Sequence, residues 1–163
     1  MKKYEKRDQQ AMAIWAADCA ERVLPLFEKA YPQDARPRTA LEVCRTWAQT
    51  GVFRMAEIRG ASLAAHAAAR AAKENHAACY AARAAGQAVA TAHVAQHAFG
   101  SALYALKAIA ALDMVQAAVS VVDEYEWQVQ RAPARLRPEI RKRVIVQKCG
   151  DKIAIKIPKD KDY

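Results

Sequence analysis

The chain has 163 residues and a formal net charge of +9; 39 of its residues are alanine and five are glycine. A chain of this length is expected to form one domain that buries roughly 70% of the surface its unfolded form exposes. Alanine has the highest helix propensity of the amino acids, so the composition predicts an all-α fold. The sequence contains no phosphate-binding glycine loop, no nucleophile elbow and no recognisable triad order, which argues against several large enzyme classes.

The positive charge is concentrated at the two ends of the chain. Residues 1–7 hold four basic and one acidic residue, and residues 131–163 hold eleven basic and four acidic residues. The remainder, 8–130, holds eleven basic and twelve acidic residues and is close to neutral. We therefore expect a basic N-terminal tail (1–7), a single helical domain (8–147) and a basic C-terminal tail (148–163).

The spacing of the cysteines and the first residues of the chain indicate the cellular compartment. The four cysteines are far apart and form no CxxC pair, so we expect reduced thiols rather than a disulfide framework. The start of the chain, MKKYEKRDQQ, leads into an amphipathic segment and not into the apolar core of a signal peptide. Both features favour a cytoplasmic protein.

Helical signals divide the domain into about six or seven helices. The first begins near Asp8 and is expected to kink or restart at Pro25, because proline removes a backbone hydrogen bond. Asn75 is placed to cap a later helix. In the helix that follows Asp113, Val119, Val122 and Val129 share helical spacing and are expected to face the core. The helices after the first are expected at about residues 37–50 and 52–73, then from about residue 76 through the alanine-rich stretch to about residue 112, and at about residues 114–130 and 138–144. Between Thr91 and Gln96 the sequence leaves open whether the helix breaks or continues.

Residues 61–112 are the most alanine-rich part of the chain. Each alanine can bury only about one methyl group, worth ~0.8 kcal/mol, so such helices gain chiefly by letting backbones approach closely. Gly86 costs about 1 kcal/mol relative to alanine in a helix interior, so we expect a close helix–helix contact there. Polar side chains recur at helical spacing in two stripes: Arg59, Ser62, His66, Arg70 and Lys73, then His76, Tyr80, Arg83, Gln87 and Thr91.

A membrane span can be set aside. Residues 84–106 form 23 uncharged positions, which is long enough to cross a bilayer. However, most of these positions are alanine, glycine or polar residues, whereas membrane helices are rich in Leu, Ile, Phe and Val. We therefore expect no contact with a membrane.

The end of the chain changes character. Residues 144–157 contain two β-branched runs around Gly150, a pattern that fits either a β-hairpin or an extended tail after the last helix. Of the two, the extended tail is slightly favoured. Because residues 149–163 offer few apolar side chains, we expect their removal to leave stability nearly unchanged.

The histidines are the first candidate for chemistry. His93 and His97 are four residues apart and share a helix face, as two ligands of one metal would. Val94 stands where a metalloprotease needs glutamate, so that mechanism is not supported. A third ligand such as His66 would have to come from elsewhere in the fold. We therefore expect no metal and no cofactor, and regard the histidines first as hydrogen-bonded groups between packed helices.

The basic ends raise the question of nucleic acid. The run RLRPEIRKR and the lysines after it could neutralise phosphates in a sequence-independent way. No aromatic platform or recognition helix accompanies that charge, so nucleic-acid binding is a lesser alternative.

Several motifs together resemble one known family. They are Arg36-Pro37-Arg38 with Glu42, Ala65-His66-Ala67, Ala82-Arg83 with Gly86, Thr91-Ala92-His93-Val94 with His97-Ala98 and Gly100, Tyr104-Ala105 with Lys107-Ala108, and Glu126-Trp127-Gln128. Over about residues 10–145 the chain resembles the immunity proteins of bacterial and archaeal polymorphic-toxin systems, in particular the fifth immunity-like family.

The resemblance implies an all-α domain that binds and neutralises a cognate toxin by protein–protein contact, without catalytic residues. The candidate binding residues are His66, Arg70, Arg83, His93, His97 and Trp127. One alternative is a helical protein or enzyme that binds a metal or small ligand through His66, His93 and His97, and a second is a nucleic-acid accessory protein. Whether the chain also forms a homo-oligomer stays open.

Overall fold

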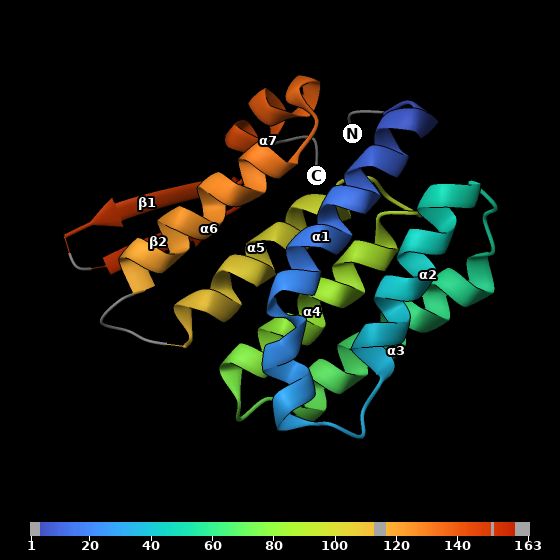
Figure 1. Cartoon of the computed structure of the whole chain (residues 1–163), viewed down its shortest axis with the longest axis horizontal. Coiled ribbons are helices and arrows are strands. Elements are labelled where there is room, and N and C mark those ends of the chain that lie inside the picture. The colour runs from blue at the N-terminus through green and yellow to red at the C-terminus, as the bar shows by residue number, and fades with distance from the viewer. Residues whose placement is uncertain (1–3, 113–116, 151, 159–163) are drawn as a thin grey trace.

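The structure of the protein is a computed structural model that describes residues 4–112, 117–150 and 152–158 (Figure 1). Within these residues it contains seven α-helices, one short 3-10 helix and one antiparallel pair of strands, which confirms the predicted all-α class. The helices are α1 (Lys6–Ala30), α2 (Arg36–Thr50), α3 (Met55–Ala71), α4 (His76–Ala90), α5 (His97–Ala110), α6 (Ala117–Arg131), η1 (Ala134–Leu136) and α7 (Arg137–Arg143). The strands are β1 (Ile145–Cys149) and β2 (Lys152–Lys156).

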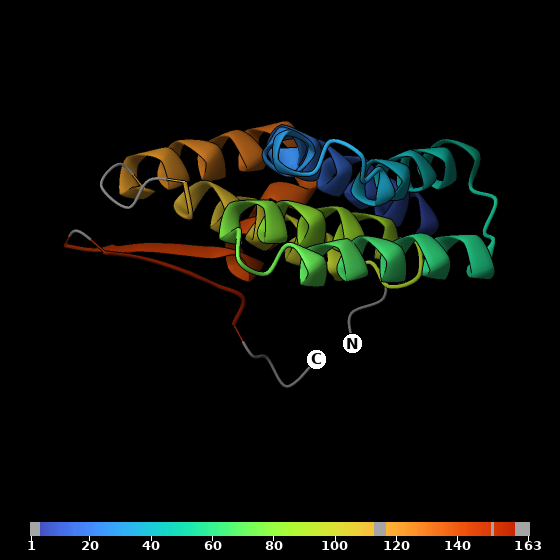
Figure 2. The ribbon, with the colours of Figure 1, turned by 90° about the horizontal axis from the view of Figure 1, so that it is seen from below.

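The six long helices form two layers. Figure 2 shows α1, α2 and α6 in one layer and α3, α4 and α5 in the other. Helix α4 lies at the centre and contacts α1, α2, α3 and α5. None of the helices in the described parts of the chain combines the length and the apolar character that a bilayer span requires.

Most positions of helix α4 are buried, and the residues at these positions are small. Its buried positions are Ala78, Cys79, Ala81, Ala82, Ala84, Ala85, Gly86, Ala88 and Val89. The large, fully buried side chains come from its neighbours, including Trp15 and Phe27 on α1, Leu41 on α2 and Phe99 on α5. Large side chains therefore supply the apolar area, while the small ones on α4 let four helices approach its backbone.

The first helix does not break and restart at Pro25, as one of the two expectations for this position had it. Helix α1 is continuous through Pro25, and its neighbours Val23, Leu24 and Phe27 are almost completely buried. Pro25 itself is exposed, so the carbonyl that loses its partner lies on the side of the helix that faces water. Burial on the other side holds the helix together.

Two further expectations about helices are corrected. The third helix begins at Met55 and not near Val52, because Gly51 ends α2 in the left-handed conformation (φ 67°) and an extended segment follows. On α6, Val119 and Val122 are exposed, whereas Val121 and Val129 are buried. Beside Val129, the Trp15 Nε1–H on α1 donates to the main-chain carbonyl oxygen of Gln128 at 2.7 Å.

The connection left open in the sequence is a break. Helix α4 ends at Ala90 and α5 begins at His97. The Gln9 side-chain amide on α1 donates to the carbonyl oxygens of Thr91 (2.8 Å) and Ala92 (3.1 Å), which have left the helical hydrogen-bond pattern. The Asn75 cap is confirmed, because its side chain accepts a hydrogen bond from the Ala78 amide at 3.1 Å.

The C-terminal segment is a hairpin and not the extended tail that the sequence slightly favoured. Strands β1 and β2 pair antiparallel from Ile145 opposite Lys156 to Cys149 opposite Lys152. The alternate residues Ile153 and Ile155 are partly buried against the core, and β2 contacts α5 and α6. The division of the chain at residues 7 and 148 stays a proposal; residues 1–3, 151 and 159–163 lie outside the described part.

This packing leads us to predict that the C-terminal segment contributes to stability, in contrast to the expectation from sequence that its removal leaves stability nearly unchanged. Ile155→Asp places a charge on the partly buried face of β2, so we expect it to lower the free energy of unfolding by about 1–2 kcal/mol in urea melts. Ala154→Asp changes the exposed face of the same strand and is the matched control. Equal melts for the two variants would show that the hairpin does not contribute to the core.

The close contact expected at Gly86 is confirmed. A Cβ atom built on Gly86 would lie 2.9 Å from Cε1 and Nε2 of His66 on α3, closer than carbon atoms normally approach. We expect Gly86→Leu to destabilise the fold by about 2 kcal/mol or more in urea melts, since the α3–α4 contact has no room for it. Gly86→Ala is expected to cost less, because the imidazole ring can shift.

Gly60 provides the control for this prediction. It also lies inside a helix, but nothing lies within 4 Å of a Cβ built there. Replacing it with leucine is expected to leave stability unchanged or raise it by up to ~0.8 kcal/mol through helix propensity. If both leucine variants behave alike, close packing at Gly86 is not what determines its effect.

Candidate functional site

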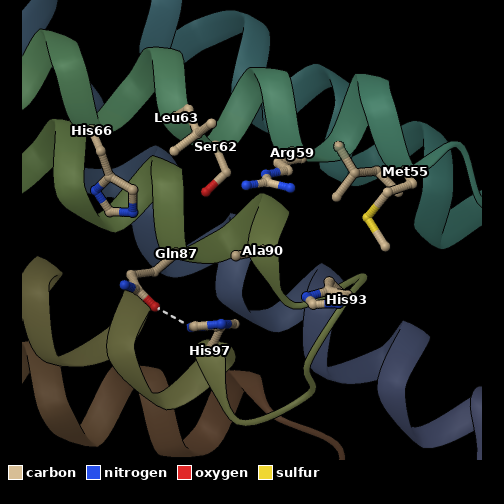
Figure 3. A pocket seen from close by; sticks show the side chains of 10 residues that line it. Met55, Arg59, Ser62, Leu63, His66, Gln87, Ala90, His93 and His97 are labelled. Carbon is tan, nitrogen blue, oxygen red and sulfur yellow. Dashed lines mark hydrogen bonds between the residues drawn. The ribbon is translucent and has the colours of Figure 1, made fainter.

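The candidate site is a pocket of about 310 Å³ between α3, α4 and the start of α5 (Figure 3). Its lining combines apolar and polar side chains from these helices and from the α4–α5 connection. The lining residues are Met55, Ile58, Arg59, Ser62, Leu63, His66, Gln87, Ala90, His93 and His97.

One wall of the pocket is a face of α3. Arg59, Ser62 and His66 are spaced by three and four residues, so they lie on the same side of the helix. The Ser62 hydroxyl donates to the Gly86 carbonyl oxygen at 3.0 Å, which links α3 to α4 beside the close contact at His66. Figure 3 shows these side chains directed from α3 toward the space in front of α4.

The opposite wall is formed by Gln87, His93 and His97. Nδ1 of His97 lies 2.7 Å from Oε1 of Gln87. An amide oxygen can only accept, so with the amide oriented this way the proton of neutral His97 is on Nδ1, and Nε2 is left to bind a ligand. Gly100 makes room for this pair, because a Cβ there would lie 2.8 Å from the same Gln87 oxygen.

The electrostatics of the pocket favour the neutral forms of His66 and His97. Burial lowers the pKa of His66, and the charges of Arg83, Arg70 and His97 lower it further. Burial also lowers the pKa of His97, with an additional contribution from His93. No aspartate or glutamate lines the pocket, and the lining residues are all among those the structure describes. At neutral pH its fixed charge is therefore the Arg59 guanidinium.

The structure brings together three of the six predicted binding residues. His66, His93 and His97 line this one pocket although they come from different elements. Arg70 is exposed further along α3 and is not part of the lining. The Arg83 guanidinium carbon lies 5.7 Å from the centre of the Tyr104 ring, also outside the lining.

Trp127 belongs to a different part of the molecule. It lies on α6 with the guanidinium carbon of Arg22 4.0 Å from its ring centre, and Arg22 also pairs with Glu124 at 2.9 Å. Burial raises the pKa of Glu124, while this arginine opposes the shift. Trp127 is thus part of the α1–α6 contact and not of the pocket.

The pocket residues that the site prediction missed are Met55, Ile58, Arg59, Ser62, Leu63, Gln87 and Ala90. A signal for three of them was present, because Arg59, Ser62 and Gln87 belong to the two polar stripes. Spacing within each helix could not show that these two stripes face one another.

A metal site is not formed by the histidines as they stand. Across residues 4–112, 117–150 and 152–158, no three His, Cys, Asp or Glu side chains are close enough together to hold a metal ion. The arrangement can instead donate and accept hydrogen bonds around a small polar group. The expectation that the protein carries no metal stays a prediction.

Comparison with known protein families is decisive for classification. Residues 2–135 match the family described as Imm-5 like putative immunity protein. The chain belongs to this family. The match covers well over half of the chain, from before α1 to η1, so it includes every element that lines the pocket. No curated protein and no solved structure matches the chain.

The lowered pKa values of His66 and His97 predict how the stability of this protein depends on pH. A histidine whose pKa is lower in the folded state binds protons more readily when unfolded, so stability falls as pH decreases below the unfolded pKa of about 6.5. We expect the melting temperature to drop between pH 7 and pH 5. The drop should be smaller in the double variant His66→Gln/His97→Gln, since glutamine does not titrate.

The comparison is made with each protein normalised to its own melting temperature at pH 8, which removes any packing loss from the substitutions. Parallel curves for the wild type and the double variant would show that other groups cause the acid sensitivity.

Proposed function

We propose that this protein binds a cognate toxin in the cytoplasm and neutralises it by direct protein–protein contact. Membership of the immunity family is the observation that carries the proposal. An immunity protein that acts in this way needs an accessible surface that its partner can cover.

The surface that best fits a protein partner surrounds the mouth of the pocket. Four large apolar side chains are exposed in the segment before α3 and along that helix: Val52, Phe53, Met55 and Leu63. We call this group the α3 rim. Met55 and Leu63 also line the pocket, so the rim and its polar interior form one continuous surface. Exposed apolar residues beside specific polar groups are typical of the centre of a protein–protein interface.

In the opposite layer, several charged side chains already form ion pairs within the protein. On α1, carboxylates are paired with arginines of α2, α6 and η1; they are Asp8, Asp18, Glu21 and Glu28. Such pairs stabilise the fold only modestly at the surface, but a partner would have to replace them. The ion pair beside the α3 rim, Arg54–Glu57 at 3.7 Å, is exposed and local to the start of α3, so covering the rim breaks no pair between helices of the described residues. The helical backbone that carries Met55 and Leu63 limits the entropy lost on binding.

The test begins with identification of the partner, by co-purification from the native host and by co-expression with each neighbouring open reading frame. A one-to-one complex that removes the toxicity of the partner is the expected result. The absence of any neutralised toxin among these partners would contradict the proposed function.

A pair of variants then locates the interface. Leu63 and Val119 are both 56% exposed, but Leu63 lies on the α3 rim and Val119 on α6. We expect Leu63→Glu to weaken toxin binding at least about tenfold, because it places a charge within the buried centre of the interface. Val119→Glu is expected to leave binding unchanged. The reverse ranking, measured by calorimetry and by rescue of growth, would move the interface to α6.

A further inference from the structure

The pocket contains an arginine without an anionic partner. None of the described residues forms a hydrogen bond or ion pair with the Arg59 guanidinium, and no carboxylate lines the pocket it faces. This contrasts with the other layer, where Arg38 and Arg45 are held by carboxylates of α1. An arginine presents several hydrogen-bond donors in a planar arrangement that suits a carboxylate.

The rest of the lining complements an anion with a short apolar body. His66 and His97 place two imidazoles on the polar side, whereas the proton of the Ser62 hydroxyl is already donated to the Gly86 carbonyl oxygen. The apolar side is made by Met55, Ile58, Leu63 and Ala90. A volume of about 310 Å³ is at the small end of the range for ligand pockets, roughly 300–1,000 Å³, which suits a small organic molecule rather than a nucleotide or a peptide.

We propose that this pocket binds a small organic carboxylate. The carboxylate group lies between Arg59 and the imidazoles of His66 and His97, and the apolar body lies against Met55, Ile58 and Leu63. This inference goes beyond toxin neutralisation and does not rest on it, because the site needs only residues of this chain.

Protonation of the histidines is coupled to binding. The positive charges of Arg83 and Arg70, together with His97, disfavour a further proton on His66, and His93 does the same for His97, so the unliganded pocket disfavours further positive charge. An entering carboxylate reverses this balance and favours the imidazolium forms. Because the Nδ1 proton of His97 is held by Gln87, Nε2 is the atom that gains the second proton. Binding therefore takes up protons, and affinity increases as the pH falls from 8 to 6.

Benzoate is the first probe, because it carries a carboxylate on a compact apolar ring. Benzamide has the same shape without the charge, and acetate has the charge without the body. Titration calorimetry with NMR of the histidine side chains is expected to show benzoate bound, with resonances of His66 and His97 shifted. Benzamide and acetate are each expected to bind at least about tenfold more weakly, a difference of ~1.4 kcal/mol.

A pair of arginine variants tests the assignment. Arg59→Gln removes the charge within the pocket, and Arg70→Gln removes an exposed charge from the same helix outside it. Both side chains are exposed, so neither variant is expected to affect folding, which a thermal melt checks. Benzoate affinity should fall about tenfold or more in Arg59→Gln and stay within about twofold of wild type in Arg70→Gln.

Three outcomes would overturn the proposal: no benzoate binding at millimolar concentration, equal binding of benzoate and benzamide, or equal losses in the two arginine variants. A toxin bound by the same protein would not alter these outcomes, since the measurements are made on the chain alone. Failure of the carboxylate site therefore leaves the proposed toxin binding untouched, and the reverse also holds.

Discussion

Close approach of the α3, α4 and α5 backbones is the constraint on which the other features of this protein depend. Helix α4 is buried against four neighbouring helices, and no residue on its buried face is larger than valine. Alanine contributes little apolar area, so the energy of the core comes mainly from large side chains such as Trp15 and Phe99 on the adjoining helices. The two kinds of helix are complementary: one allows short distances between backbones, and the other fills the space around them.

The pocket follows from the same close packing. Gly86 lets the imidazole of His66 lie against the α4 backbone, and Gly100 does the same for the side chain of Gln87 against α5. A side chain at either glycine would displace a polar group that lines the pocket. Stability and the shape of the pocket therefore depend on the same two positions.

Charge is distributed in a way that separates the two layers of the fold. In the layer of α1, α2 and α6, carboxylates and arginines neutralise one another across helices, as in the pairs Asp18–Arg45 and Glu124–Arg22. In the α3–α4–α5 layer, the pocket has histidines and an arginine but no carboxylate. The overall net charge of +9 conceals this difference, because the basic ends of the chain dominate it. A partner or ligand would meet a positive, partly apolar pocket on a body that is otherwise near neutral.

The sequence by itself determined the helical class, the close contact at Gly86, the Asn75 cap and the family, because each rests on local propensity, helical spacing or a run of matched motifs. The expectation that His93 and His97 share a helix face is wrong, because His93 lies in the connection after α4 and His97 begins α5, although both line the pocket. Only the tertiary structure decided that His66 lines the same pocket as His93 and His97, and that Trp127 does not. It also decided that Arg59 and Gln87 lie on opposite walls of that pocket. It likewise decided the break at residues 91–96, where Gln9 from the start of the chain binds the freed carbonyls. These outcomes depend on contacts between residues far apart in sequence. Such contacts are set by which helix faces pack together. The periodicity within one helix contains no information about the helix beside it.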